Sequence, residues 1–263
     1  WLMVLVFLFG LCIGSFLNVL IYRLPRSLAI TGRSFCPKCK KNISWRENIP
    51  LLSFVFLGGR CRYCHSPIGW QYPTVEFLTG VLFLTTVLFL PDLNIKYQIL
   101  NIQYFLSLGY YLFLISGLIV ISFIDLQHQI IPDQVIYPAV IIALAFSLMT
   151  NSQLLITNKL PAAIGASGFF LLLHLMTRGR GMGFGDVKLA FLMGLILGFP
   201  KIAVAFYLAF LTGAFGGVIL VLAGKKRFGQ HLPFGPFLTG ATLISLFWGQ
   251  DLWLIFQKIM GSP

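Results

Sequence analysis

Apolar runs long enough to cross a lipid bilayer recur along almost the whole chain. An α-helix needs about 20 mostly apolar residues to span the hydrocarbon core, and most of the runs approach this length. Hydrophobic residues make up 58% of the chain and charged residues 10%, which excludes a soluble globular domain. The sequence therefore predicts an all-α polytopic integral membrane protein with about eight transmembrane helices. We expect these helices at residues 1–22, 74–90, 104–124, 134–150, 160–177, 187–199, 202–223 and 236–256.

The first run has the features of a retained helix rather than of a signal peptide that is removed. No basic residue precedes it and no small-residue cleavage site follows it, whereas Arg23 and Arg26 come shortly after it. Because basic residues collect on the cytoplasmic side of a membrane, we expect the N-terminus outside. Asn18 is the polar residue of this run, and it fits a hydrogen bond to a neighbouring helix as well as it fits a role in a site.

The net charge of +12 comes from 19 basic and 7 acidic residues. In a soluble protein this balance would suggest nucleic acid, but cytoplasmic loops rich in Lys and Arg explain it here, so we expect no nucleic-acid partner. Nine basic residues lie in the polar insert at 23–73. If consecutive helices cross the membrane in alternating directions, fifteen basic residues lie on the same side of the membrane as this insert and four lie on the other side. This distribution predicts a cytoplasmic insert and both termini outside. The six outside the insert on its side are Arg178, Arg180, Lys188, Lys225, Lys226 and Arg227, and the four opposite are Lys96, Lys159, Lys201 and Lys258.

Two C-x-x-C pairs lie in the insert, Cys36 with Cys39 and Cys61 with Cys64, separated by 21 residues. This spacing is close to that of a zinc ribbon in which four thiolates surround one tetrahedral ion. Such a closed site is structural, because a catalytic zinc keeps one position open. Two disulfides are the alternative, but a basic loop facing the reducing cytoplasm favours thiols. We therefore expect Zn²⁺ bound by the four cysteines.

A glycine-rich stretch at 181–188 places Asp186 at the mouth of a membrane helix, where an acidic residue is costly and suggests function. Asp125 closes another run, and the topology brings both acids to the cytoplasmic boundary although 61 residues separate them. Two carboxylates can hydrolyse a peptide when one takes a proton from water and the other donates a proton to the carbonyl oxygen. Because like charges a few ångströms apart do not both ionise easily, we expect the pair to share one proton and to titrate as a unit.

Several residues near these acids are candidates for a supporting role. Gly183 and Gly185 would let an extended substrate backbone approach. Lys188 either tunes Asp186 or holds a lipid phosphate. Asp133 and Glu76 each have a plain structural interpretation, since both are expected in the first turn of a helix, where the helix dipole favours an acid. The histidines show no ligand spacing.

Together these motifs resemble those of the bacterial type IV prepilin peptidases. The resemblance rests on the two cysteine pairs, on Asp125 with Ile131-Pro132-Asp133, and on Gly183-Phe184-Gly185-Asp186-Val187-Lys188. The sequences GSFLNVLIYRLP at 14–25 and PFGPF at 233–237 are similar to the opening and the last segment of that family. The match runs over nearly the whole chain, and no motif position departs from it.

This resemblance implies a membrane aspartic peptidase of the G-x-G-D class in the bacterial inner membrane, with Asp125 and Asp186 as the catalytic pair. It also implies N-methylation of the new N-terminal residue, usually Phe, with S-adenosylmethionine as the donor. Substrates in the family are type IV prepilins and pseudopilins. The sequence then divides into a first transmembrane helix at 1–22, a cytoplasmic zinc-binding insert at 23–73 and a membrane peptidase core of about seven helices at 74–263. The methyl-donor site is unassigned, and the basic insert is the expected neighbourhood.

Two other classes of function stay open at this point. A proton- or ion-coupled transporter would also carry membrane acids, although these are expected near mid-bilayer on broken helices. A non-catalytic membrane scaffold with a zinc-ribbon binding module would need no meeting of Asp125 with Asp186. The proximity of the two carboxyls in the fold separates these alternatives from the peptidase.

Overall fold

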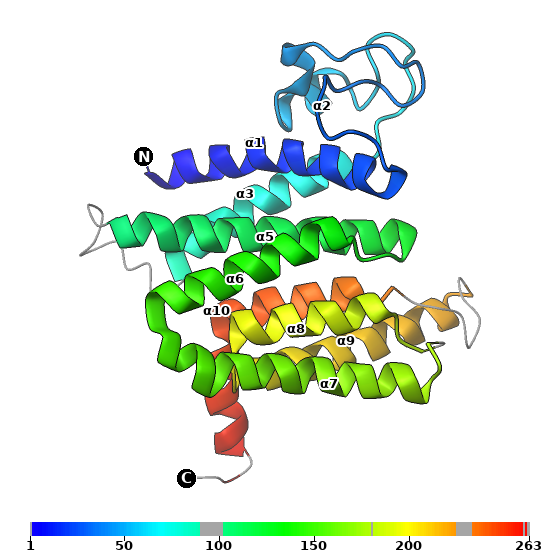
Figure 1. Ribbon diagram of the computed structural model, residues 1–263. Helices are drawn as coiled ribbons and strands as arrows, with labels where there is room; N and C mark the ends of the chain where they lie inside the picture. The colour runs from blue at the N-terminus through cyan, green and yellow to red at the C-terminus, as the bar shows by residue number, and fades with distance from the viewer. Residues whose placement is uncertain (1, 90–101, 180, 225–232, 260, 262–263) are drawn as a thin grey trace. The chain divides into compact units, whose positions relative to one another are not determined.

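A computed structural model describes residues 2–89, 102–179, 181–224, 233–259 and 261 (Figure 1). Within these ranges the chain is helical and has no strand, apart from two isolated β-bridges in the insert. The chain divides into two compact units, 1–120 and 121–263. The helices are α1 (Leu2–Arg23), α2 (Leu52–Phe56), α3 (Gln71–Phe89), α5 (Ile102–His128), α6 (Asp133–Leu154), α7 (Leu160–Met176), α8 (Phe184–Leu197), α9 (Lys201–Leu222) and α10 (Gly235–Ile259).

All eight predicted helices are present, and the all-α membrane architecture is confirmed. Five elements of the described chain are long and apolar enough to cross a bilayer. One of them joins α6 and α7 through the π-helical turn η4 (Leu155–Lys159), next to non-helical dihedral angles at Asn151. The number of eight crossings stays a prediction. The five elements are Met3–Arg26, Gln71–Phe89, Ile102–His128, Asp133–Met176 and Lys201–Leu222.

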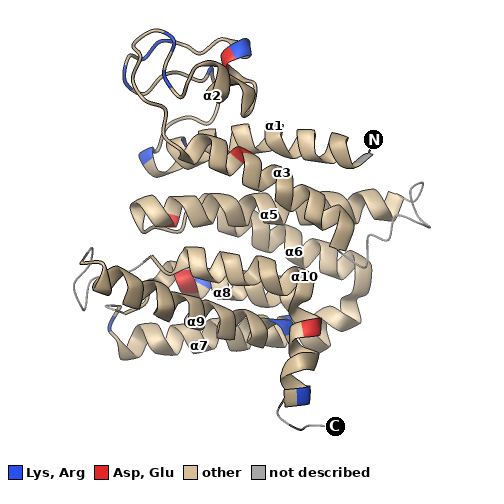
Figure 2. Ribbon diagram, turned by 180° about the vertical axis from the view of Figure 1, so that it is seen from behind, with Lys and Arg blue, Asp and Glu red and all other residues tan. Residues whose placement is uncertain are grey.

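Charge is distributed as the hydropathy predicts. Figure 2 shows basic residues gathered on the insert, whereas the long helices are almost free of charged residues. Many large apolar side chains on these helices are exposed, such as Leu5 at 62% and Ile141 at 65%. In a bilayer such side chains contact lipid, so their exposure needs no protein partner.

Small residues let α1 and α3 approach closely in the first unit. A Cβ atom on Gly10 would lie 2.7 Å from the Cα atom of Gly80, and one on Gly14 would lie 2.7 Å from the Cα atom of Glu76. Close packing through glycine is typical of membrane helix pairs. Asn18 donates from Nδ2 to the Tyr72 carbonyl at 3.0 Å, so it does make the hydrogen bond to a neighbouring helix.

The insert after α1 is organised by the buried side chain of Arg23. Its guanidinium group donates hydrogen bonds of 2.7–2.9 Å to four backbone carbonyls, those of Ala29, Ile30, Thr31 and Arg33. These bonds turn the chain back on itself directly after the helix. A buried guanidinium group is stable when its N–H groups are satisfied in this way.

Each cysteine pair of the insert lies in a short hairpin, and the two hairpins have matching hydrogen bonds. In the first, Cys36 N–H donates to Lys41 O, and in the second, Cys61 N–H donates to Ser66 O, both at 2.9 Å. The bridges Phe35 to Asn42 and Arg60 to Pro67 occupy equivalent positions. The residue after the second cysteine has a positive φ in both, 61° at Lys40 and 53° at His65. The hairpins therefore present two sulfurs each in the same manner.

Helix α8 forms the interior of the second unit. It contacts α6, α7, α9 and α10, and ten of its 14 residues are buried. At Gly194 a Cβ atom would lie 2.3 Å from the Cα atom of Ala163, so α7 and α8 are in backbone contact there. A helix that is apolar on all sides is expected in such a position.

Candidate functional site

Asp186 lies in the first turn of α8, after Gly183 at the N-cap position. Its Oδ2 atom accepts a hydrogen bond of 3.0 Å from the Gly183 N–H, and its side chain is buried at 8% exposure. The N–H groups at a helix N-terminus have no partner within the helix, and the helix dipole favours negative charge there. The glycine-rich stretch thus places a carboxyl group where the backbone supplies a donor.

Asp125 lies in the last turn of α5, which continues to His128 instead of ending before the acid. The positive φ of 55° at Gln129 ends this helix. The Asp125 Oδ2 atom accepts a hydrogen bond of 2.9 Å from the N–H of Gly235, the first residue of α10. A Cβ atom at Gly235 would lie 2.7 Å from that oxygen, so this contact requires glycine.

Both acids belong to the second unit, where α10, whose first residue donates to Asp125, contacts α8, which carries Asp186. Both are buried, and each receives one N–H from a glycine at its Oδ2 atom. Among the described residues no protein group donates to either Oδ1 atom. The pair therefore has carboxyl oxygens left for a water molecule or a substrate carbonyl.

The loop before α8 is held by residues that the sequence did not single out. His174 Nδ1 lies 2.8 Å from the Met182 carbonyl, and its ring packs 6.0 Å from the ring of Phe184. A Cβ atom at Gly185 would lie 2.9 Å from Cβ of Ile131, so the loop also packs against the segment after α5. His174 carries no sequence signal of its own, because it acts through a contact made by the fold. Gly235 belongs to the PFGPF segment at 233–237, but that motif did not indicate its contact with Asp125.

Lys188 and Asp133 form an ion pair with each other. Asp133 is the first residue of α6, which agrees with its interpretation as a first-turn acid. The Lys188 ammonium also lies 5.4 Å from the centre of the Tyr137 ring. Lys188 was expected either to tune Asp186 or to bind a lipid phosphate, and neither expectation included this ion pair with Asp133.

Glu76 belongs to the first unit, and its expected position in its helix is wrong. Helix α3 begins at Gln71, so Glu76 lies in the second turn. The helix extends further back than predicted because Pro73 is tolerated in a first turn, where its missing N–H needs no partner. The Glu76 Oε2 atom accepts a hydrogen bond of 2.9 Å from the N–H of Leu51.

The four cysteines of the insert are free thiols that form one cluster, with all four sulfurs within 4.8 Å of one another. The Cys36 and Cys64 sulfurs are 3.9 Å apart, far longer than a disulfide bond of about 2.05 Å. Four sulfurs at about 2.3 Å from a tetrahedral zinc ion are roughly 3.8 Å apart, so the cluster fits a metal ion.

The environment of the cluster favours thiolates at some positions. Hydrogen bonds from the side chain and backbone of Ser66 lower the pKa of Cys64 to about 6. Burial raises the pKa of Cys36, but the backbone N–H groups of Cys39 and Lys38 outweigh it and the pKa is lowered. The backbone N–H of Lys41 lowers the pKa of Cys39, but burial and the neighbouring sulfurs outweigh it and raise the pKa to about 11. A divalent cation would stabilise all four sulfurs as thiolates.

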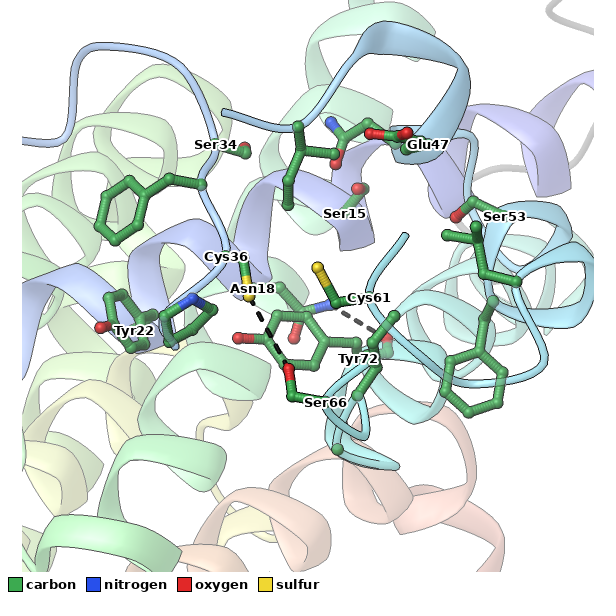
Figure 3. A pocket seen from close by; sticks show the side chains of 18 of the residues that line it. Ser15, Asn18, Tyr22, Ser34, Cys36, Glu47, Ser53, Cys61, Ser66 and Tyr72 are labelled. Carbon is green, nitrogen blue, oxygen red and sulfur yellow. Dashed lines mark hydrogen bonds between the residues drawn. The ribbon is translucent and has the colours of Figure 1, made fainter. Parts of the chain in front are cut away.

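A cavity of about 450 Å³ lies beside this cluster, within the first unit. Figure 3 shows side chains from α1, from the insert and from the start of α3 around it, with Cys36 and Cys61 among the lining residues. Its volume lies in the range of roughly 300–1,000 Å³ that is typical of small-molecule sites.

Comparison with known proteins identifies the family. Residues 112–222 match the type IV leader peptidase family, and residues 8–90 match the bacterial peptidase A24 N-terminal domain. A prepilin leader peptidase/N-methyltransferase of Aeromonas hydrophila is 35% identical, over 94% of this chain and 91% of its own length. The chain belongs to the type IV leader peptidase family.

Two further relatives have the same name. The Pseudomonas aeruginosa protein is 31% identical over 97% of this chain and 93% of its own length. The Bacillus subtilis protein is 30% identical over 97% of this chain and 98% of its own length. No solved structure matches this chain.

The contact between Asp125 and Gly235 leads to a prediction for stability. We expect Gly235→Ala to destabilise the protein by about 1–3 kcal/mol, because the new methyl group overlaps the buried carboxyl group and disturbs its N–H donor. Gly240→Ala is the matched control, since a Cβ atom at Gly240 in the same helix meets nothing within 4 Å. The measurement is thermal unfolding in detergent.

A double-mutant cycle with Asp125→Ala makes this prediction specific. Removing the carboxyl group makes room for the methyl group, so Gly235→Ala should cost much less in the Asp125→Ala background. Equal costs in both backgrounds would contradict the contact.

Proposed function

We propose that this protein cleaves the leader peptide from type IV prepilins and related pseudopilins, and then methylates the new N-terminal residue. The observation that carries this proposal is the pair of buried carboxyls, Asp125 and Asp186, each held by a glycine N–H. It occurs in a chain whose relatives over nearly the whole length are named prepilin leader peptidase/N-methyltransferase. The protein is an aspartic endopeptidase with N-methyltransferase activity.

In the peptidase reaction, one carboxyl group of the pair is ionised and the other is protonated. The carboxylate takes a proton from a water molecule, and the oxygen of that water attacks the scissile carbonyl. The carboxylic acid donates its proton to the carbonyl oxygen, which gives a tetrahedral intermediate. When this intermediate collapses, the C–N bond breaks, the leaving nitrogen takes the proton that the first carboxyl group removed from water, and the hydroxyl proton returns to the second carboxyl group. Gly183 and Gly235 hold the acids through Oδ2, which leaves Oδ1 of each for the water molecule or the substrate carbonyl. Gly185 has no side chain at the start of α8, which would let the substrate backbone approach the acids.

Methyl transfer requires an unprotonated amine placed in line with the methyl carbon. S-Adenosylmethionine supplies that carbon on a positively charged sulfur. The residues of this chain bind the donor, exclude water and hold the amine nearby. We place this chemistry in the first unit, at the cysteine insert.

We propose a structural Zn²⁺ ion bound by Cys36, Cys39, Cys61 and Cys64. The sulfur positions and the lowered pKa of Cys64 support this assignment. The ion would close the insert by joining its two hairpins, which otherwise hold few apolar residues of their own.

The protein would lie in the cytoplasmic membrane of a bacterium as a multi-pass protein in contact with lipid, with the insert inside and both termini outside. The basic residues of the insert support this orientation. Five of the charges used to infer it, on Lys96, Arg180, Lys225, Lys226 and Arg227, lie outside the described residues. A prepilin leader is a short basic segment ahead of an apolar helix, so its scissile bond would lie at the inner boundary, near helix ends.

The transporter and scaffold alternatives are less consistent with these observations. Asp125 lies in the last turn of α5 and Asp186 in the first turn of α8, whereas a transporter site is expected near mid-bilayer. A scaffold would not require two buried acids in one unit, each held at Oδ2 by a glycine N–H.

Asparagine at either acid tests the peptidase directly. We expect Asp125→Asn and Asp186→Asn each to reduce leader cleavage by at least ~100-fold, because an amide keeps the shape of the side chain but does not transfer the proton. Asp251→Asn, at an exposed acid of α10, is the matched control. Cleavage of a prepilin substrate by purified protein is measured by mass spectrometry.

Retention of more than about a tenth of the parent rate would remove the catalytic role from the substituted residue, since the loss of a general acid or base costs at least ~100-fold. An unchanged melting temperature distinguishes lost chemistry from lost folding.

The metal assignment leads to a second test. Purified protein should contain one zinc per chain by elemental analysis, and Cys61→Ser should lose it. Cys12→Ser is the matched control, because Cys12 lies exposed in α1 and outside the cluster. Absence of zinc from the parent, with the four thiols paired as disulfides, would contradict both the metal site and the cytoplasmic insert.

A further inference from the structure

The cavity beside the cysteine cluster is lined mainly by apolar surface, into which a few buried polar side chains are set. It is lined by Asn18 from α1 and Glu76 from α3, together with side chains of the insert. Both residues are buried, at 3% and 9% exposure. Their hydrogen bonds, and those of the basic residues around them, indicate which ligand the cavity can accept.

Asn18 carries a buried acceptor without a partner. Its Nδ2 atom donates to Gly14 O at 3.3 Å and to Tyr72 O at 3.0 Å, which fixes the amide orientation, since the reverse would place Oδ1 against two carbonyl oxygens. In the fixed orientation Oδ1 has no hydrogen-bond partner among the described residues. A buried acceptor left unpaired is costly, so this atom calls for a donor from a ligand.

Glu76 adds a carboxyl group that has no basic partner in the described part of the chain. Its Oε2 atom accepts the Leu51 N–H at 2.9 Å. Within the described ranges Glu76 forms no ion pair. The ion pair of the insert is between Arg62 and Glu47. A buried carboxylate normally has a cation beside it.

The basic residues that line the cavity are committed elsewhere or exposed. The Arg23 guanidinium group donates to four backbone carbonyls, and Arg62 lies 3.2 Å from Glu47. Lys38 is exposed. The interior is therefore suited to a cation or a hydrogen-bond donor, and poorly suited to a phosphate.

Aromatic rings complete the lining. Tyr22, Phe35, Phe54 and Tyr72 all line the cavity, and Figure 3 shows Tyr22 and Tyr72 among its lining side chains. The face of an aromatic ring attracts a cation and stacks on a flat heterocycle. The cavity thus combines an acidic group, an unpaired acceptor and aromatic faces in a volume of about 450 Å³.

We propose that this cavity binds the methyl donor, a nucleoside that carries a sulfonium cation, with Glu76 offsetting the positive charge and Asn18 Oδ1 accepting from an N–H group of the ligand. The inference rests on the methyltransferase activity proposed above and locates it within the first unit. Cys36 and Cys61 line the same cavity, so the metal site would also shape the donor site.

This arrangement also provides for release of the product. In the transfer, the amine lone pair forms the N–C bond, the C–S bond breaks with its electron pair going to sulfur, and a proton leaves the amine to water. The sulfur becomes a neutral thioether, so its attraction to Glu76 is lost. The cavity should therefore bind S-adenosylmethionine more tightly than S-adenosylhomocysteine.

The test is calorimetric binding of these two ligands to the full-length, zinc-containing protein in detergent. We expect Glu76→Gln to weaken binding of S-adenosylmethionine by about tenfold or more, as for a lost charge-assisted contact, and to change binding of S-adenosylhomocysteine by less than about threefold. Asp251→Asn is the matched control, because that carboxylate is exposed in α10 and does not line the cavity. Its affinity for both ligands should match that of the parent.

Equal weakening of both ligands by Glu76→Gln would assign Glu76 a structural role and overturn the proposed charge contact, as would unchanged binding of both. If the parent binds neither ligand, the methyltransferase activity itself fails, which is a different outcome from failure of this site.

A second measurement uses the unaltered protein and does not depend on the variant folding. Ultraviolet cross-linking of labelled S-adenosylmethionine, followed by peptide mapping, should place the label within residues 15–23 or 34–76. A label found only in residues 121–263 would overturn the assignment.

Discussion

A buried carboxyl group in a membrane protein must receive its hydrogen bonds from the protein, because lipid offers none. Three acids of this chain meet that requirement in the same manner. The carboxyl group of each accepts a hydrogen bond from a backbone N–H group of another residue. Gly183 donates to Asp186, Gly235 to Asp125 and Leu51 to Glu76. Side-chain donors would add bulk and charge, whereas backbone donors leave space for water or a ligand. The glycines, the positive φ of 59° at Leu51 and the close helix packing all serve to bring these N–H groups into place.

Much of this arrangement could be predicted from the sequence where the signal is local. Hydropathy located all eight of these helices, because a long run of apolar residues by itself indicates a segment that lies in the membrane. The spacing of the cysteines predicted one cluster of four sulfurs, since a C-x-x-C hairpin sets the direction of its own side chains. Asp125 and Asp186 were identified because acidic residues are rare in this chain and costly at membrane helices.

The contacts that could not be predicted join residues far apart in sequence. Asp125 and Gly235 are separated by 110 residues, and glycine has no side chain that would signal the contact. Lys188 pairs with Asp133 across 55 residues, and neither charge specifies its partner. The sequence does not indicate the contact of His174 with the Met182 carbonyl, because this contact forms only when the loop before α8 folds. The start of α3 was placed three residues too late, at 74, although Pro73 is compatible with the first turn of a helix.

The two chemistries draw on different parts of the chain. The acids and the backbone donors that hold them belong to residues 121–263, whereas the thiols, Glu76 and the cavity belong to residues 1–120. The central claim is therefore that cleavage and methylation use separate residues. The most direct measurement supplies a pre-cut peptide with a free N-terminal Phe, together with labelled methyl donor, to the Asp186→Asn protein. Label transfer close to that of the parent is the predicted result, because methylation needs no activated water. Absence of transfer by a folded variant, with good transfer by the parent, would mean one shared site and contradict the account.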